Sequence, residues 1–385
     1  MKRAIGYFVH HQGRGHAERA AAIVRALPSE QPVALFSARP DMFPPLPPHV
    51  QVVTLPSLFE PPADAATSPL LACARTPETL HCAPLGWDTI TQAIATLTRW
   101  FVEERPALFI TDVSAELAQL ARIASVPCVP VLQHGDRSDP GHMSAYEGAV
   151  GILAPYSAVL EQPGRPQWML DKTHYAAGVG IDAQLPDRAA ALRSLGLPTD
   201  REIILVIAGG GGTGTPATPL TLGARAEPDT LWLTIGAVEQ EWHATSPGNL
   251  RHLGWVDDVE SWIAAADRIV SSAGNTTVHQ VAASGRPWIV VPEWRYFDEQ
   301  LWKAHMLDGA GAAAVLDHWP SHVGAWRQAW AKAAALPVAA RRSLVDPDAA
   351  AGAAAWLVAL ADSLWAPPVV AVPIATVLPV TESRA

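Results

Sequence analysis

The segment from Ser271 to Pro292 combines residue types that suit the binding of an anion. It reads S-S-A-G-N-T-T-V-H-Q-V-A-A-S-G-R-P-W-I-V-V-P, and a helix is expected at Thr277–Ala283. The residues before that helix have small or short polar side chains, which leave room for a ligand. They are Ser272, Ala273, Gly274, Asn275 and Thr276. Because the first N–H groups and the dipole of a helix favour negative charge, the segment predicts a phosphate-binding turn.

A second turn, A-G-G-G-G-T-G-T at residues 208–215, follows an expected strand at Ile203–Ala208. Consecutive glycines let the backbone approach a phosphate closely, and a threonine hydroxyl adds a donor. The residues expected at the phosphates are Gly210, Gly211, Thr213 and Gly214. The phosphate loop of an ATPase has lysine and then serine or threonine after its last glycine. This chain has Thr215 and Pro216 there, so the turn predicts phosphate binding without ATPase chemistry.

The segment H-H-Q-G-R-G-H at residues 10–16 follows an expected strand at Ala4–Val9. Parallel α/β sheets bind ligands at the carboxyl ends of their strands, so the N–H groups of Gly13 and Gly15 and the imidazole of His16 are expected at that edge. Because the unperturbed pKa of histidine is near neutral, His16 is a candidate general base. The alternative is a surface histidine that caps the turn.

Two aspartates are expected at the same edge of the sheet. Asp112 follows a strand at Leu108–Thr111, and Asp136 comes after a strand at Cys128–Leu132. Either carboxylate could orient the His16 imidazole or replace it as the base. A dinucleotide-binding fingerprint would need a third glycine where Glu18 stands, so the sequence does not indicate NAD.

A polar cluster starts the helix expected at Leu301–Leu307. It consists of Asp298, Glu299 and Gln300. Their oxygens suit the hydroxyl groups of a sugar, although acidic residues also favour the start of a helix as caps. Beside the anion turn, the cluster predicts contact with a sugar.

Strand and helix patterns alternate through both halves of the chain. In the first half, strands are expected at Ala4–Val9, Pro32–Phe36, Val50–Leu55, Leu108–Thr111 and Cys128–Leu132, and helices at Ala17–Leu27, Thr89–Glu104 and Ala115–Ala124. In the second half, strands are expected at Ile203–Ala208, Thr230–Ile235, Arg268–Ser271 and Trp288–Val291, and helices at Val259–Ala266, Thr277–Ala283, Leu301–Leu307 and Asp348–Leu364. This order predicts an α/β fold of two facing Rossmann-like domains, with the active site in the cleft between them.

A looser stretch with several prolines and glycines near the middle of the chain predicts the domain boundary. The expected division is a first domain at residues 1–160, a linker at 161–182 and a second domain at 183–345. A C-terminal helix at 346–365 and a loosely ordered tail at 366–385 are expected to follow.

Composition and charge exclude several classes of function. The formal net charge of −10 argues against a nucleic-acid partner, which needs clustered lysine and arginine. Three irregularly spaced cysteines fit neither a zinc site nor a disulfide framework, and they indicate a reducing compartment. The sequence has no signal-peptide pattern and no apolar run of about eighteen residues. A cytoplasmic protein without a transmembrane segment is expected.

The motifs in Gly254–Ala313 resemble the donor-binding half of the GT-B glycosyltransferases of family 28. They are G-W-V-D-D, A-A-D-R-I-V-S-S-A-G-N-T-T, A-A-S-G-R-P and D-E-Q-L-W-K-A, in the family's order. The G-R-G-H turn followed by A-E-R-A, and the Gly209–Gly214 turn, are also similar to the family. The resemblance therefore covers most of the chain.

The resemblance implies a metal-independent hexosyltransferase without a cofactor, whose donor is a nucleotide-diphosphate sugar, with a UDP-sugar favoured. It places Trp255 and Val256 against the base and the two glycine turns around the diphosphate. It places the Asp298–Gln300 cluster on the transferred sugar and His16 near the acceptor hydroxyl. The family usually has a glutamate on the ribose hydroxyls, where this chain has Gln280, so that contact lacks a charge-assisted bond.

The sequence leaves the acceptor and three competing functions open. The acceptor is a small molecule, a glycan or a lipid-linked compound, and peripheral membrane contact stays open. An apolar patch of Leu46, Leu55, Leu58 and Phe59 would suit a lipid, but the region lacks lysine, which favours a small molecule or glycan. The competing functions are a nucleotide-sugar hydrolase, a nucleotide-sugar epimerase and a non-catalytic nucleotide-binding module. The proline-rich segment 56–84 and Q-H-G-D-R at 133–137 favour a transferase, because they could shape an acceptor pocket.

Overall fold

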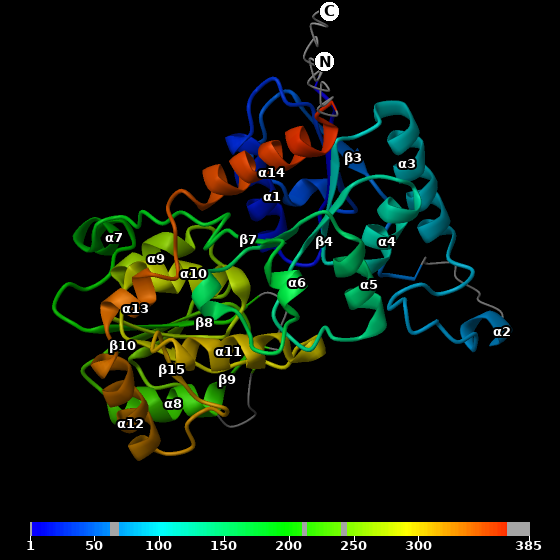
Figure 1. The fold of residues 1–385 in the computed structure, drawn as a ribbon. Helices are drawn as coiled ribbons and strands as arrows, with labels where there is room; N and C mark the ends of the chain where they lie inside the picture. The colour runs from blue at the N-terminus through cyan, green and yellow to red at the C-terminus, as the bar shows by residue number, and fades with distance from the viewer. Residues whose placement is uncertain (1, 62–68, 210–213, 240–244, 368–385) are drawn as a thin grey trace, which may run out of the picture.

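The computed structural model describes residues 2–61, 69–209, 214–239 and 245–367, and it contains two parallel sheets, each with helices packed against it (Figure 1). The first sheet has seven strands in the order β3-β2-β1-β4-β5-β6-β7. These strands are β1 (Ile5–Phe8), β2 (Val33–Ser37), β3 (Val50–Thr54), β4 (Leu108–Asp112), β5 (Cys128–Val131), β6 (Ile152–Ala154) and β7 (Thr173–Tyr175). The helical segments among them are α1 (Arg14–Ala26), η1 (Pro40–Met42), α2 (Pro69–Ala72), α3 (Asp88–Glu104), α4 (Ala115–Ile123), α5 (Pro140–Gly148), η2 (Ala158–Leu160) and α6 (Gln167–Leu170).

The second sheet has six strands in the order β12-β10-β8-β13-β14-β15. Its strands are β8 (Ile203–Ile207), β10 (Leu231–Ile235), β12 (Leu250–His252), β13 (Arg268–Ser271), β14 (Trp288–Val290) and β15 (Ala314–Val315), and a small separate sheet pairs β9 (Thr215–Pro216) with β11 (Val238–Glu239). The helical segments are α7 (Arg188–Ser194), α8 (Ala217–Ala226), α9 (Val259–Ala265), α10 (Asn275–Ser284), η3 (Tyr296–Asp298), α11 (Glu299–Gly309), α12 (Val323–Ala335), α13 (Val338–Arg342) and α14 (Ala349–Trp365).

The central strands explain why the chain forms these sheets. Every residue of β1, β4 and β8 is buried, as expected for parallel strands that helices cover on both faces. Helix α1 buries a stripe of small and apolar residues, including Ala17, Ala20 and Val24, against its sheet. The α/β fold with two parallel Rossmann-like sheets is therefore confirmed.

The structure corrects the position of the domain boundary. Strand β7 lies inside the predicted linker at residues 161–182, yet it pairs with β6 at the edge of the first sheet. The chain leaves that sheet only after Tyr175. Strands of three residues are too short to show a period in the sequence, which is why the linker was placed too early.

The last described helix returns to the first domain. Helix α14 lies beside α1 (Figure 1), and Ala353 and Leu357 join the apolar cluster of the first sheet. Trp365 at its end donates a hydrogen bond to the Ala107 carbonyl at 3.1 Å. The tail expected at 366–385 lies almost entirely outside the described residues.

Two further surface expectations can be checked. The predicted apolar patch is wrong, because Leu55 and Leu58 are buried in the core of the first domain. Leu46 is partly buried against the other face of the sheet, and Phe59 packs against His10. Within the described residues, no helix is long and apolar enough to cross a membrane.

Candidate active site

The predicted glycine turns meet where the two domains face each other. A side chain at Gly15 of the first domain would overlap the hydroxyl of Thr276 in the second. On the second domain, a Cβ on Gly209 would lie 3.5 Å from Ser272 Oγ. Successive turns lie more than fifty residues apart in the sequence, and the tertiary structure brings them together. Gly210, Gly211 and Thr213 lie outside the described residues.

The anion turn opens directly into α10. The helix begins at Asn275, two residues earlier than expected, so Asn275 and Thr276 belong to its first turn. Gly274 precedes it in an extended conformation with φ −63°, and no described side chain caps the helix there. Ser272 Oγ is buried and has no hydrogen-bond partner among the described residues. The turn thus offers free backbone N–H groups and one unused hydroxyl to an anion.

The side chain of Gln300 fixes the position of this turn by a hydrogen bond to its backbone. Its buried amide oxygen accepts from the N–H groups of Ala273 and Glu293, both at 2.9 Å. The oxygen that the sequence analysis assigned to a sugar hydroxyl is therefore occupied by the backbone. Gln300 fixes the turn relative to the segment between β14 and α11.

His16 is bonded to a buried carboxylate. Its Nδ1 lies 3.1 Å from Asp112 Oδ1, while Arg19 Nη2 donates to both oxygens of Asp112 at 2.8 and 2.7 Å. Arg19 Nη2 also lies 3.0 Å from His16 Nδ1. Because this nitrogen already donates to both oxygens of Asp112, we infer that His16 carries its proton on Nδ1 and donates a hydrogen bond to the carboxylate. The Nε2 of His16 is then free to accept a proton, and the side chain is 20% exposed.

Asp112 stays ionised in this arrangement. Its complete burial would raise the pKa of the carboxyl, but Arg19 and then His16 outweigh burial and hold this pKa well below its ordinary value. Of the two aspartates predicted at the sheet edge, Asp112 is the one bonded to His16. Asp112 is fully buried and paired, so it orients the imidazole and is not itself exposed to a substrate.

Asp136 lies on a different contact. Its side chain is exposed and accepts from the hydroxyl of Ser138 at 2.7 Å, and its backbone N–H donates to the Phe297 carbonyl at 2.7 Å. The structure therefore separates the role of Asp136 from that of Asp112. Asp136 belongs to a loop of the first domain, between β5 and α5, that contacts the second domain at Phe297.

This loop and the start of α11 form a second bridge between the domains. Arg137 donates to Glu299 Oε2 at 3.2 Å and lies 4.8 Å from the Phe297 ring centroid. Phe297 and Asp298 have φ of +61° and +53°, a left-handed conformation that is unfavourable for such residues. Glu299, which was predicted to contact the sugar, is thus paired with an arginine of the first domain.

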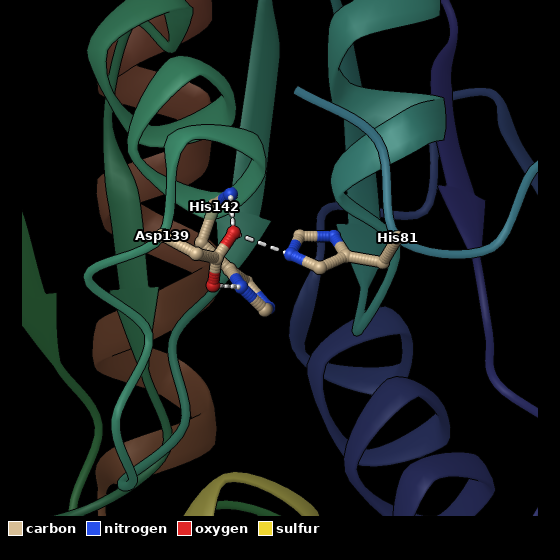
Figure 2. A group of neighbouring side chains, drawn as sticks. All are labelled: His81, Asp139 and His142. Atoms are coloured by element: carbon tan, nitrogen blue, oxygen red, sulfur yellow. Dashed lines mark hydrogen bonds and ion pairs between the residues drawn. The ribbon is translucent and has the colours of Figure 1, made fainter. Parts of the chain in front are cut away.

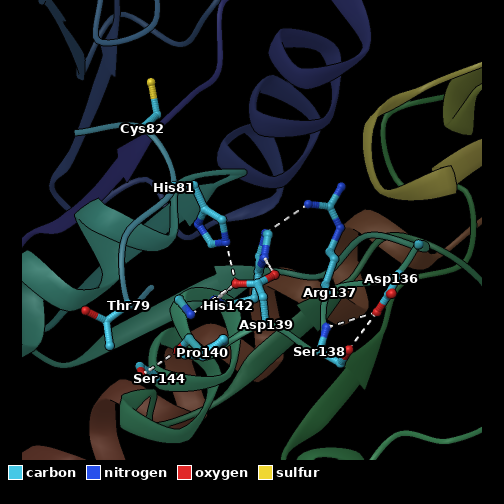
Figure 3. Close-up of polar contacts among 12 residues, drawn as sticks. Thr79, His81, Cys82, Asp136, Arg137, Ser138, Asp139, Pro140, His142 and Ser144 are labelled. Carbon is cyan, nitrogen blue, oxygen red and sulfur yellow. Dashed lines mark hydrogen bonds and ion pairs between the residues drawn. The ribbon is translucent and has the colours of Figure 1, made fainter. Parts of the chain in front are cut away.

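A hydrogen-bonded chain of side chains extends from this bridge into the first domain. His142 Nδ1 lies 2.7 Å from Asp139 Oδ2, and His81 Nε2 lies 2.5 Å from Asp139 Oδ1 (Figure 2). Figure 3 shows Arg137 against the other side of His142, with Nη1 and Nε2 3.0 Å apart. Burial, then Arg137, lowers the pKa of His142 to about 4, so this imidazole is neutral at pH 7.

This row of hydrogen-bonded side chains contains the one group of described residues that could hold a metal ion. One ligand atom each from His81, Asp139 and His142 lie within 4.8 Å of one another. A cation bound there would break the hydrogen bonds that Asp139 accepts from His81 and His142, and Arg137 would repel it. The network instead fastens the segment around His81, which belongs to the proline-rich stretch 56–84, to α5.

The remaining predicted donor residues lie on the second domain. Trp255 is 65% exposed, so its ring is open to a base, and Val256 is partly buried against the apolar core of the second domain. Gln280, predicted at the ribose, donates to Glu260 Oε1 on α9 at 2.8 Å. Asp258 accepts from the Ser261 N–H at 3.0 Å and caps α9. On the first domain, Gly13 precedes α1 with φ +95°, a conformation that favours glycine.

Sequence reasoning missed several residues that the structure places at this interface. They are Arg19, Arg137, Glu260, Lys303 and the His81–Asp139–His142 network. Each lies within an ordinary helix or loop pattern. Some of them stood in segments that the sequence had singled out for other residues: Arg19 in A-E-R-A, Lys303 in D-E-Q-L-W-K-A and Arg137 in Q-H-G-D-R.

Comparison with known proteins agrees with this geometry. Residues 237–319 match the glycosyltransferase family 28 C-terminal domain. MurG of Acinetobacter baumannii has a similar structure, with a TM-score of 0.61 and 14% identity over 93% of this chain and 100% of that one. A UDP-glucosyltransferase of Polygonum tinctorium, capable of glucosylating indoxyl, has a TM-score of 0.64 and 12% identity over 94% and 99%. The chain thus has the fold of these two structures, and its residues 237–319 resemble the family 28 C-terminal domain.

A curated relative extends the comparison to the sequence of a named enzyme. It is the UDP-N-acetylglucosamine–N-acetylmuramyl-(pentapeptide) pyrophosphoryl-undecaprenol N-acetylglucosamine transferase of Yersinia pseudotuberculosis. The identity is 32% over 171 residues, which is 42% of this chain. The chain thus spans about half (48%) of the length of the curated relative.

Proposed function

We propose that this protein is a glycosyltransferase that moves a hexosyl group from a nucleotide-diphosphate sugar to a hydroxyl acceptor without a metal ion. The observation that carries the proposal is the meeting of the glycine turns of both domains beside the His16–Asp112 pair. The family 28 C-terminal domain covers the anion turn and the start of α11, which supports the assignment of the donor to the second domain.

The proposed mechanism divides the work between the domains. The free N–H groups and the dipole of α10 stabilise the negative charge of the departing diphosphate. His16 Nε2 takes the proton of the acceptor hydroxyl, and the Asp112 carboxylate stabilises the imidazolium that forms. The acceptor oxygen then forms the new bond to the anomeric carbon as the bond to the diphosphate breaks.

A UDP-sugar is the favoured donor. The name of the Yersinia relative specifies UDP-N-acetylglucosamine, and the exposed Trp255 offers a face on which a base could stack. The name of the Yersinia relative also specifies a pyrophosphoryl-undecaprenol acceptor, whereas the Polygonum enzyme glucosylates indoxyl. We keep a small molecule or glycan as the favoured acceptor and a cytoplasmic location as a prediction.

Incubation of the protein with UDP-glucose and UDP-N-acetylglucosamine separates transfer from hydrolysis. Release of UDP only in the presence of a cell extract is the expected result, and the sugar should then appear on a component of the extract. Release of the same amount of UDP in buffer alone would identify a hydrolase. Release that stops after EDTA treatment would contradict the metal-independent mechanism.

We expect a nucleoside diphosphate to stabilise the protein against heat, whereas NAD and ATP should do so weakly. A ligand that binds only the folded state adds about 2.7 kcal/mol at a concentration of about 100 times its Kd. A thermal-shift series with UDP, GDP, CDP and dTDP measures the effect. If none of the four raises the melting temperature, the donor site is not where we place it.

Gly274→Val should abolish donor binding in a protein that still folds. The φ of Gly274, −63°, is accessible to valine. The nearest atoms to an added Cβ are Thr277 Oγ1 at 3.9 Å and Ser272 Oγ at 4.0 Å, so the side chain fits the free protein but fills the phosphate space. Calorimetry with UDP measures the loss, and Gly248→Val, where a Cβ meets nothing within 4 Å, is the matched control.

A further inference from the structure

Lys303 is a buried lysine between the two domains. It lies on α11 with 1% of its surface exposed, and its ammonium donates to Asn275 Oδ1 at 2.7 Å. Asn275 is the first residue of α10, and its own amide donates to the Pro155 carbonyl of the first domain at 3.2 Å. Lys303 is therefore tied to the anion turn by the residue that opens the helix.

The charged groups around Lys303 leave it without a carboxylate of its own. They are Glu299 on the same helix, Arg19 on α1 and Arg137 on the loop before α5. Arg19 pairs with Asp112, and Arg137 pairs with Glu299. Among the residues that the structure describes, the ammonium donates a hydrogen bond only to the neutral amide of Asn275. Since a buried charge is costly unless it is paired, the interface holds a positive charge that calls for an anion.

The surroundings also make Lys303 the titratable group of this interface that changes charge near pH 8. Burial is the main reason that its pKa falls to about 8; Glu299 opposes the fall, and Arg19 and Arg137 add to it. Two neighbouring imidazoles, His134 and His279, are neutral at that pH, because burial holds the pKa of each far below its ordinary value. A bound anion would favour the charged ammonium and raise the pKa of Lys303.

An independent observation at the same turn also indicates an anionic ligand. The buried Ser272 hydroxyl has no hydrogen-bond partner within the described ranges, and its oxygen lies 3.5 and 4.0 Å from where a Cβ would stand on Gly209 and on Gly274. An unused buried donor beside a helix N-terminus is costly unless a ligand completes it. The hydroxyl and the first N–H groups of α10 therefore belong to the same turn, and the ammonium is linked to that turn through Asn275.

We propose that Lys303 supplies the positive charge that balances the diphosphate of the donor at the α10 turn, while holding Asn275 in position. The inference rests on the proposed function, because that function makes a nucleoside diphosphate the ligand. Lys303 is a positioning residue: it orients Asn275 and places a buried, weakly screened cation behind the free N–H groups of the helix. The leaving diphosphate thus receives its counter-charge from the protein itself.

Isothermal titration with UDP and with inorganic pyrophosphate, which lacks a base, tests the inference. Lys303→Met should weaken the binding of both ligands about tenfold, because it removes a buried positive charge behind the start of α10 and the hydrogen bond that orients Asn275. Lys303→Arg should keep most of the affinity. Lys332→Met is the matched control, because Lys332 is an exposed lysine paired with Asp308, and it should bind as the wild type does.

The pH profile distinguishes a role of the charge from a merely structural role. In the wild type, the affinity for UDP should be full below about pH 8 and fall as the pH rises above that value, because the ammonium of the free protein loses its proton there. Lys303→Arg should show no such fall, and Lys303→Met should be weak and independent of pH. If Lys303→Met binds both ligands as tightly as the wild type, the inference is overturned and the donor site stands. The same conclusion follows if the affinity of the wild type for UDP does not change with pH. If the wild type binds neither ligand, the proposed function itself fails.

Discussion

His16→Ala is expected to lower turnover by about 10²–10⁴-fold while the affinity for the nucleotide-sugar donor stays nearly unchanged. Asp112 holds His16 through Nδ1, which leaves Nε2 available for the acceptor proton. His16 belongs to the first domain, whereas the anion turn belongs to the second, so the substitution removes the base without removing a phosphate contact. Steady-state kinetics measure turnover, and calorimetry with UDP measures donor affinity.

A matched control and one alternative outcome make this result decisive. His49→Ala, which removes an exposed histidine of the same domain, should leave both quantities unchanged. Near-normal turnover in His16→Ala together with a collapse in Asp136→Asn would transfer the role of base to Asp136. His16 would then be a residue of the turn, held by Asp112 for structural reasons.

Asp112→Ala is expected to lower the free energy of unfolding by about 3–5 kcal/mol, because it leaves a buried charge without its partner. Arg19 is 3% exposed and donates to both oxygens of Asp112, and His16 loses its acceptor at the same time. Urea denaturation followed by circular dichroism measures the loss. Asp41→Ala breaks an exposed pair with Arg39 and should leave stability almost unchanged, because surface ion pairs contribute little.

The contribution of Asp112 also depends on pH in a defined direction. Its pKa in the folded protein lies below its ordinary value of 3.8, so the stabilisation is complete above that value and is lost as the pH falls below it. The wild type should therefore lose stability in acid more steeply than Asp112→Ala. Equal acid sensitivity of the two proteins would show that the ion pair does not carry this stability.

The residues singled out by sequence reasoning were found on the right elements for a local reason. Ser272–Thr276 follow β13 and open α10, and Gly13–His16 follow β1 and open α1. Glycine at positive φ, small residues before a helix and a capping aspartate act within a few positions of the chain, so their patterns are visible without the fold. The same holds for the buried central strands, whose continuous apolar runs predicted two parallel sheets.

The sequence by itself determined the two-sheet fold, the order of its main elements and the turns that end its strands. The tertiary structure decided which of these turns meet, since Gly15 approaches Thr276 only when the domains face each other. It also decided the partners of the charged groups: Arg19 with Asp112, Arg137 with Glu299 and Lys303 with Asn275. The physical reason is the separation along the chain between the groups that interact. Helix periods, caps and turns depend on neighbours along the chain, whereas the cost of a buried charge depends on groups that are distant in sequence and become neighbours only on folding.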